Sequence, residues 1–190
     1  MKSPLKAFVV ALAVGAAIPL AYAAKFRFDT MQAEQADRAF DSSYKKLAPG
    51  VYVTAQIKPD DLVRFRDRAA IKSVIDLRPD GESADQPPSA QMAAEARKSD
   101  LGFSYVPTPH GRVSNGVVTQ FDAALANSQK PVLIYCRSGS RAARVWALSE
   151  ASRSGGLDGA VILAAVRAAG LSADSERAEI EQRIAARKPN

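Results

Sequence analysis

Short apolar runs alternate with amphipathic segments over residues 48–190, and this alternation predicts the fold class. Four runs have the length and composition of buried strands, at residues 51–54, 71–77, 103–106 and 132–135. Helical spacing follows each run, starting near Pro59, Pro87, Ser114 and Arg141, and two further helices are expected over about 157–169 and 173–187. Strands that alternate with helices predict an α/β domain with a parallel-rich central sheet flanked by helices.

The first 23 residues have the layout of a secretory signal peptide. A short basic start precedes an apolar stretch from Ala7 to Leu20, and Ala21-Tyr22-Ala23 forms a small-x-small cleavage motif. The apolar stretch also approaches the minimum length that spans a bilayer, so an uncleaved inner-membrane anchor is the alternative. Both interpretations predict a periplasmic or secreted domain, with membrane contact only through this segment if it is retained.

The next segment, residues 24–47, is polar and mixed. We interpret it as an N-terminal extension that is helical from about Thr30 to Lys46, and Pro49-Gly50 then interrupts the chain. The predicted organisation is therefore a signal peptide over 1–23, an extension over 24–47 and one folded domain over 48–190.

Composition narrows the chemistry. The chain has one cysteine, which cannot form an internal disulfide, so in an exported protein this residue is buried filler, an intermolecular link or a reactive thiol. One cysteine and one histidine cannot supply the four ligands of a zinc site, and no Gly-rich dinucleotide motif is present, so we expect no metal and no cofactor. The basic residues are not interleaved with aromatic residues in a patch, which argues against nucleic-acid binding.

The lone cysteine stands at the end of the last predicted strand. It opens the segment Cys136-Arg137-Ser138-Gly139-Ser140-Arg141, and a helix follows. A loop at a helix N-terminus directs several backbone N–H groups into one concavity, which binds oxyanions and favours a thiolate over a thiol. Gly139 permits backbone torsions that a Cβ resists, and Arg141 can bind an oxyanion with two parallel hydrogen bonds. Arg137, Ser138, Gly139 and Ser140 are candidate substrate-binding residues, and Cys136 with Arg141 is the candidate catalytic pair.

Several motifs, in this order, carry a family resemblance over residues 51–150. They are Leu77-Arg78-Pro79-Asp80-Gly81-Glu82, Gln86-Pro87, Gly102-Phe103-Ser104-Tyr105-Val106-Pro107, the loop from Cys136 to Arg141, and Trp146-Ala147-Leu148. The chain resembles the phosphatase-like family found also in beta-lactamase-hydrolase-like proteins, the DUF442 group. The resemblance implies a protein-tyrosine or dual-specificity-phosphatase-like fold and a cysteine-dependent hydrolase or sulfurtransferase. Four residues separate Cys136 from Arg141, as is common in rhodanese-like sulfurtransferases, whereas tyrosine phosphatases usually have five.

A phosphatase of this kind needs an acid to protonate its leaving group. By resemblance the acid lies in the loop after residues 105–107, but residues 108–112 contain no aspartate. His110 in that loop is one candidate acid, and Asp80 is the other, because its strand should end at the same side of the sheet. Asp80-Gly81 is also an ordinary turn dipeptide. Arg78 is a candidate for substrate binding, or it pairs with Glu82 and holds the turn.

The sequence therefore favours an exported, cysteine-dependent phosphatase-like hydrolase acting on a small anionic or phosphorylated substrate. The first alternative is a rhodanese-like sulfurtransferase, in which Cys136 accepts sulfur from a sulfane-sulfur donor as a persulfide and no general acid is required. The second alternative is a non-catalytic module that binds anions or a partner.

Overall fold

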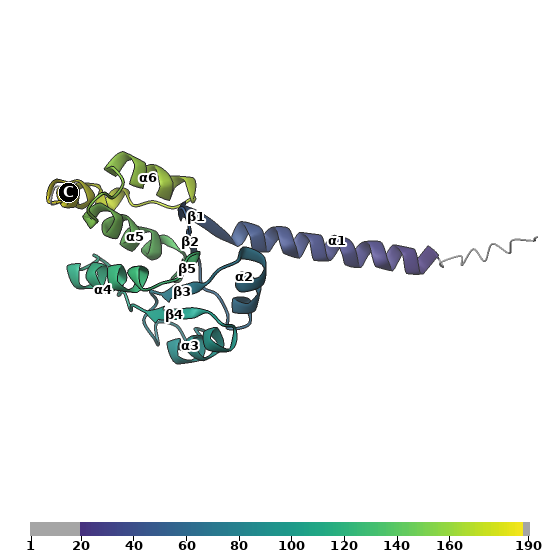
Figure 1. Ribbon diagram of the computed structural model, residues 1–190. Coiled ribbons are helices and arrows are strands. Elements are labelled where there is room, and N and C mark those ends of the chain that lie inside the picture. Colours follow the sequence, from purple (N-terminus) through teal and green to yellow (C-terminus); the bar gives the residue numbers. More distant parts are fainter. Residues whose placement is uncertain (1–19, 188–190) are drawn as a thin grey trace, which may run out of the picture. The chain divides into compact units, whose positions relative to one another are not determined.

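The computed structural model describes residues 20–187, which fall into two compact units that divide between Ala39 and Phe40 (Figure 1). Helix α1 (Leu20–Ser43) begins in the first unit and ends in the second. Most of the predicted signal peptide, residues 1–19, lies outside the described residues, and residues 20–23 belong to α1. Within residues 20–187, no helix combines the length and the apolar character needed to cross a lipid bilayer.

The second unit contains a five-stranded sheet with the order β1-β2-β5-β3-β4. Its strands are β1 (Tyr44–Ala48), β2 (Val51–Thr54), β3 (Ser73–Asp76), β4 (Gly102–Tyr105) and β5 (Val132–Tyr135). β1 pairs antiparallel with β2, and the other three pairings are parallel. The sequence prediction of a parallel-rich α/β sheet flanked by helices is confirmed, with β5 in the central position expected of a strand that is apolar on both faces.

Helices connect the strands and continue beyond the last one. They are α2 (Asp61–Ala69), α3 (Ser89–Lys98), α4 (Asn115–Ala126), α5 (Ser140–Ser152), α6 (Gly159–Ala168), the short 3-10 helix η1 (Asp174–Glu176) and α7 (Arg177–Ala185). The start of α4 illustrates how local sequence sets these bounds. The Ser114 side chain accepts a hydrogen bond from the Val117 N–H at 3.3 Å, which satisfies one of the N–H groups left free in the first turn.

The core divides into two layers because successive residues of a strand point to opposite faces of the sheet. In β5, Val132 and Ile134 belong to a cluster that includes residues of α4, α5, α6 and α7. Leu133 and Tyr135 belong to a second cluster with α2 and α3. The result is a three-layer sandwich, and Figure 1 shows α4 and α2 on opposite sides of the strands.

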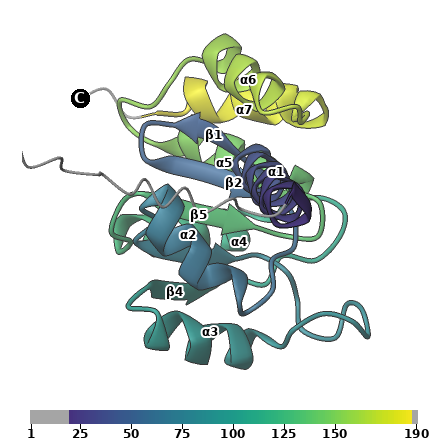
Figure 2. The same cartoon turned by 90° about the vertical axis from the view of Figure 1, so that its right-hand side faces the viewer.

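Strand β1 corrects the predicted extension of the first helix. We expected a helix to Lys46, but α1 ends at Ser43 and residues 44–48 form the edge of the sheet, next to β2 (Figure 2). Only Leu47 of this strand is buried, and Lys45 and Lys46 are exposed. Lysines on an exposed edge strand discourage pairing with another chain, but in the sequence they make the strand look like a polar helix. The folded unit therefore starts before the boundary that we predicted at residue 48.

The parallel strands bring their carboxyl ends to one edge of the sheet. β2, β5, β3 and β4 end there at Thr54, Tyr135, Asp76 and Tyr105, which are paired with one another in the register of the ladder. In open α/β sheets this edge is where ligands bind, and all the candidate residues from the sequence follow one of these strand ends.

Candidate active site

The loop from Cys136 to Gly139 joins β5 to α5. Gly139 occupies the N-cap position of α5 with φ +86°, a left-handed conformation that side chains with a Cβ rarely adopt. A Cβ at this position would also lie 3.4 Å from the Thr54 carbonyl oxygen of the neighbouring strand. The Gln56 N–H donates to the Arg137 carbonyl at 3.3 Å and ties the loop to the segment after β2. Gly139 therefore fits the predicted role in shaping the turn.

A cavity of about 130 Å³ lies at this helix N-terminus. It is lined by Pro109, His110, Gly111, Cys136, Arg137, Ser138, Ser140, Arg141 and Arg144. The Cys136 side chain is buried in its wall, and Ser138 Oγ donates to Ser140 Oγ at 3.3 Å on its rim. Two segments far apart in sequence, 109–111 and 136–144, thus enclose one small space. Its size and its position at a helix N-terminus suit a tetrahedral oxyanion.

Arg141 is buried and held in place by hydrogen bonds. Its Nη1 donates to the carbonyl oxygen of Thr108 at 2.7 Å and to that of Leu77 at 3.4 Å. Its Nη2 donates to Glu82 Oε1 at 2.7 Å. These acceptors fix the plane of the guanidinium beside the cavity, so little side-chain entropy is lost when an anion binds there.

Glu82 is the functional candidate that the sequence interpretation missed. Its carboxylate accepts hydrogen bonds from Arg141 and, at 2.8 Å, from Arg78 Nε, and its side chain is only 12% exposed. Burial alone would raise the pKa of Glu82, but the hydrogen bonds from Arg78 and Arg141 outweigh it and hold the pKa below its usual value. The pairing with Arg78 was one of the two alternatives in the sequence. The link to Arg141 could not be found there, because the two residues are distant in the chain.

His110 lies at the mouth of the cavity. Its Nε2 is 3.0 Å from Glu82 Oε1 and 3.1 Å from Arg141 Nη2, and the side chain is 68% exposed. An imidazole is suited to proton transfer near neutral pH, and a carboxylate at this distance orients the ring. Of the two candidate acids, His110 is therefore the one that lines the same cavity as Cys136.

Asp80 and Arg78 stand apart from this cavity. The Asp80 carboxylate accepts hydrogen bonds from the Ser89 N–H at 2.7 Å and from Ser89 Oγ at 2.6 Å, at the first residue of α3. It therefore satisfies N–H and O–H donors at a helix start, as a capping residue does. Arg78 is buried, and its Nη1 donates to Gln56 Oε1 at 2.8 Å. Neither side chain is part of the cavity wall, and both hold neighbouring loops.

Asp76 is a second buried carboxyl near the site that the sequence interpretation did not single out. It ends β3 beside Tyr135 of β5, it is 1% exposed, and its Oδ1 accepts the Arg78 N–H at 2.8 Å. Burial raises the pKa of Asp76 to about 6, although the hydrogen bond from Arg78 lowers it. Burial and the nearby Asp76 charge raise the pKa of the Tyr135 hydroxyl as well.

Within residues 20–187 we find no cluster of three histidine, cysteine or acidic side chains arranged to hold a metal ion.

The strand order and the cysteine loop before α5 define a protein-tyrosine or dual-specificity-phosphatase-like domain. Residues 43–153 match the sequence family described as the beta-lactamase hydrolase-like protein, phosphatase-like domain. This chain belongs to that family, which confirms the resemblance inferred from the motifs.

The alignments with curated relatives cover only a small part of each relative's length. A beta-lactamase hydrolase-like protein of Xylella fastidiosa is 35% identical over 98 residues, which cover 52% of this chain and 22% of that protein. A beta-lactamase hydrolase-like protein of Agrobacterium fabrum is 30% identical over 80 residues, which cover 42% of this chain and 19% of that protein. The chain thus spans about a fifth of the length of these relatives, so the similarity concerns their phosphatase-like domain.

Solved structures support the same assignment. A protein from Neisseria meningitidis described as a candidate phosphatase has a TM-score of 0.64 and 26% identity, over 75% of this chain and 98% of its own. A DUF442 protein from Shewanella putrefaciens has a TM-score of 0.60 at 17% identity, over 78% of this chain and 94% of its own. The catalytic core of the PP-IP phosphatase Siw14 from S. cerevisiae has a TM-score of 0.53 at 14% identity, over 77% of this chain and 85% of its own. At these lower identities the last two structures establish the fold.

Proposed function

We propose that this protein is an exported, cysteine-dependent phosphatase that hydrolyses phosphate monoesters through Cys136. The observation that carries the proposal is that Cys136, Arg141 and His110 line one cavity sized for an oxyanion at the N-terminus of α5. Membership of a phosphatase-like family supports the same reaction class.

In the first step the Cys136 thiolate attacks phosphorus in line with the leaving oxygen. The S–P bond forms, the P–O bond to the leaving group breaks, and the protonated His110 ring donates its proton to the departing oxygen. The N–H groups of the loop and the Arg141 guanidinium stabilise the charge on the three equatorial oxygens. The products are a cysteinyl-phosphate, a neutral alcohol or phenol, and a neutral imidazole.

In the second step water replaces the first product. The neutral His110 accepts a proton from water as its oxygen attacks phosphorus, the S–P bond breaks, and phosphate leaves with Cys136 restored as a thiolate. Glu82 remains ionised throughout, in keeping with its lowered pKa, and orients both His110 and Arg141. Asp80 takes no part in this scheme, since both oxygens of its carboxylate accept hydrogen bonds from Ser89.

A rhodanese-like sulfurtransferase is the second candidate. The observation that favours it is the spacing of four residues between Cys136 and Arg141, with no carboxyl side chain among the residues that line the cavity. In this reaction the Cys136 thiolate attacks the outer sulfur atom of a sulfane-sulfur donor such as thiosulfate, the S–S bond of the donor breaks, and sulfite leaves. A thiolate or cyanide then attacks the outer sulfur of the Cys136 persulfide, and the Cys136 thiolate is restored. A proton donor is not needed.

The test compares two assays on the purified chain from Ala24 onward and on its Cys136→Ser and Cys136→Ala variants. One assay measures 4-nitrophenyl phosphate hydrolysis, and the other measures sulfur transfer from thiosulfate to cyanide. We expect phosphate release that both variants lose, together with a phosphorus signal from trapped cysteinyl-phosphate. Sulfur transfer alone, again lost in both variants, would replace the phosphatase by the sulfurtransferase. Silence in both assays with retained binding of phosphate would favour the non-catalytic module.

Export is a separate part of the proposal and rests on the N-terminal sequence. Expression of the full chain in a Gram-negative host with a C-terminal tag tests it. We expect the tagged protein in the periplasmic fraction, with an N-terminus at Ala24 by mass spectrometry. A full-length product in the membrane fraction would indicate the uncleaved anchor, and a full-length product in the cytoplasm would refute export.

A further inference from the structure

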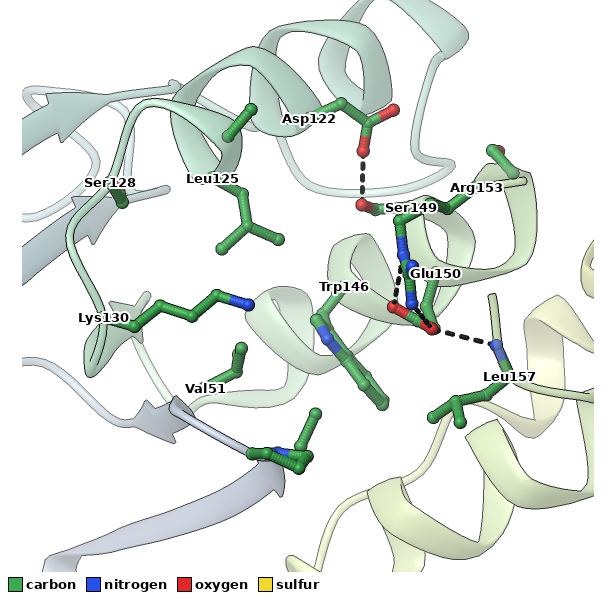
Figure 3. A pocket seen from close by; sticks show the side chains of 14 residues that line it. Val51, Asp122, Leu125, Ser128, Lys130, Trp146, Ser149, Glu150, Arg153 and Leu157 are labelled. Carbon is green, nitrogen blue, oxygen red and sulfur yellow. Dashed lines mark hydrogen bonds and ion pairs between the residues drawn. The ribbon is translucent and has the colours of Figure 1, made fainter. Parts of the chain in front are cut away.

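Figure 3 shows a second cavity, of about 720 Å³. It lies at the ends of the strands opposite to Cys136. Val51, the first residue of β2, is part of its wall, and Val51 pairs with Val132 at the start of β5. The turn between β1 and β2, the end of α4, the second half of α5 and the segments that follow these two helices supply the remaining walls. Cavities of this size in other proteins hold small organic ligands.

The floor of this cavity is apolar. Trp146 of α5, Leu125 of α4 and Leu157 after α5 converge on it together with Val51 (Figure 3). Leu125 and Leu157 are only partly buried, although both pack against the main core. Trp146 and Val51 are themselves buried, so the accessible apolar surface is that of Leu125 and Leu157, which gains free energy when an apolar group displaces water from it.

Most of the charged groups in the walls are already paired. The Glu150 carboxylate accepts from the Arg153 guanidinium and, at 2.9 Å, from the Leu157 N–H, and Asp122 accepts from the Ser149 hydroxyl. The Arg153 guanidinium thus neutralises the Glu150 charge, whereas Asp122 has a neutral hydrogen-bond donor.

Lys130 is different, because it makes no ion pair with any residue in the described part of the chain. Its stem lies against the turn at Gly50, where a Cβ would meet Lys130 Cβ and Cδ at 3.2 Å, and Gly50 has φ +72°. The absence of a side chain at Gly50 thus leaves room for the stem, and Figure 3 shows the ammonium group extending over the apolar floor.

We propose that this cavity binds an amphipathic carboxylate, with its apolar body on Leu125 and Leu157, next to the buried Trp146, and its carboxylate on the Lys130 ammonium. An apolar body matches the floor, and a single negative charge matches the single unpaired cation. A dianionic head such as a phosphate monoester would bring a second negative charge close to Glu150 and Asp122, which disfavours it. This site shares no lining residue with the cavity at Cys136.

Equilibrium dialysis with labelled decanoate tests the proposal, with the emission of Trp146, the single tryptophan of the chain, recorded in parallel. We expect saturable binding at one site and a change in emission that follows the same curve. Decan-1-ol and decyltrimethylammonium have the same chain without the negative charge. They should bind at least about 10-fold more weakly, the order expected for a lost hydrogen bond to a charged group.

Variants assign the binding to this cavity. Lys130→Met keeps the stem against Gly50 and removes the charge, so it should weaken decanoate binding about 10-fold and leave decan-1-ol unchanged. Lys58→Met, at an exposed lysine outside the cavity, is the matched control and should bind as the wild type does. Cys136→Ser should also bind decanoate normally, which separates this site from the proposed active site.

Three results would overturn the proposal. The first is dialysis without saturable decanoate binding. The second is equal affinity for decyltrimethylammonium, which would leave Lys130 without a role. The third is loss of binding in Cys136→Ser with Lys130→Met unaffected, which would place the carboxylate in the loop at the other end of α5.

Discussion

The buried carboxyl of Asp76 makes the stability of this domain depend on pH in a direction that can be measured. Asp76→Asn is the perturbation, because the amide oxygen can still accept the Arg78 N–H, which donates to Asp76 Oδ1 at 2.8 Å. The variant keeps the shape of the side chain and removes only its ability to ionise. We expect it to be more stable than the wild type at pH 7 and to lose that advantage as the pH falls.

The magnitude follows from the pKa of the folded state. The pKa of Asp76 rises from 3.8 to about 6 on burial, so the folded protein binds this proton more tightly than the unfolded chain does. The free energy of unfolding of the wild type therefore increases as the pH falls from 7 towards 4, and the increase levels off below the unfolded pKa. One unit of pKa corresponds to about 1.4 kcal/mol, which gives a limit of about 3 kcal/mol, of which about 1.3 kcal/mol falls between pH 7 and pH 5.

The assay is urea denaturation of the wild type and of Asp76→Asn at half-unit steps from pH 5 to pH 7. The quantity of interest is the variant's free energy of unfolding minus that of the wild type. This difference cancels the contributions of other groups, such as Glu82, whose lowered pKa acts in the opposite direction at lower pH. Asp60→Asn, at an exposed residue before α2, is the matched control, and its difference in free energy of unfolding from the wild type should not change with pH.

A difference in free energy of unfolding for Asp76→Asn that does not change with pH would refute the reasoning, because it would mean that burial does not raise the pKa of Asp76. A difference that grows as the pH falls would also refute it, since that sign belongs to a carboxylate stabilised by its partners. The first result would indicate water access to the end of β3.

Three further substitutions test the site and its supports. His110→Asn should lower kcat for phenyl phosphate about 100-fold and for 4-nitrophenyl phosphate much less, because the better leaving group needs less protonation; equal losses would exclude His110 as the acid. Glu82→Gln removes one partner of a buried ion pair and should lower the free energy of unfolding, measured by urea denaturation, by about 3 kcal/mol. Glu181→Gln, at an exposed residue, should lower it little. Equal losses in the two variants would contradict the pairing of Glu82 with Arg141. Gly139→Ala, at φ +86°, should lower the free energy of unfolding by about 1–2 kcal/mol and lower kcat. Gly116→Ala in α4 is the control and should leave the free energy of unfolding unchanged or raise it. An unchanged free energy of unfolding for Gly139→Ala would show that the loop does not require this conformation.

Local signals explain why much of the fold could be predicted. β2 and β5 start and end where the sequence indicates, since each is a short apolar run with a turn or a loop at either end. The loop at Cys136 was also predictable, because a strand end, a glycine and a helix start follow one another directly in the chain. In each case the residues that determine the structure are neighbours in sequence.

The features that the sequence did not predict correctly depend on contacts between residues that are distant in the chain. β1 is recognisable as a strand only through its pairing with β2 and the packing of Tyr44 on Tyr52. Asp80 does follow a strand at the predicted edge, but the turn directs its carboxylate to Ser89 instead of the cavity. The role of Glu82 depends on Arg141, which a sequence pattern cannot place beside it.

The position of β5 also determines when the thiol becomes protected during folding. β5 is the last strand in sequence among the described residues and the middle strand of the sheet. It must insert between β2 and β3, which precede it in the chain. Pairings between distant segments form slowly because the chain entropy of closing long loops comes before the gain from contacts. Cys136 is therefore exposed to oxidants and to thiol reagents on all sides until the sheet closes, and afterwards it can be reached only through the cavity that it lines. The change in the alkylation rate of Cys136 while the chain refolds thus measures the insertion of its central strand.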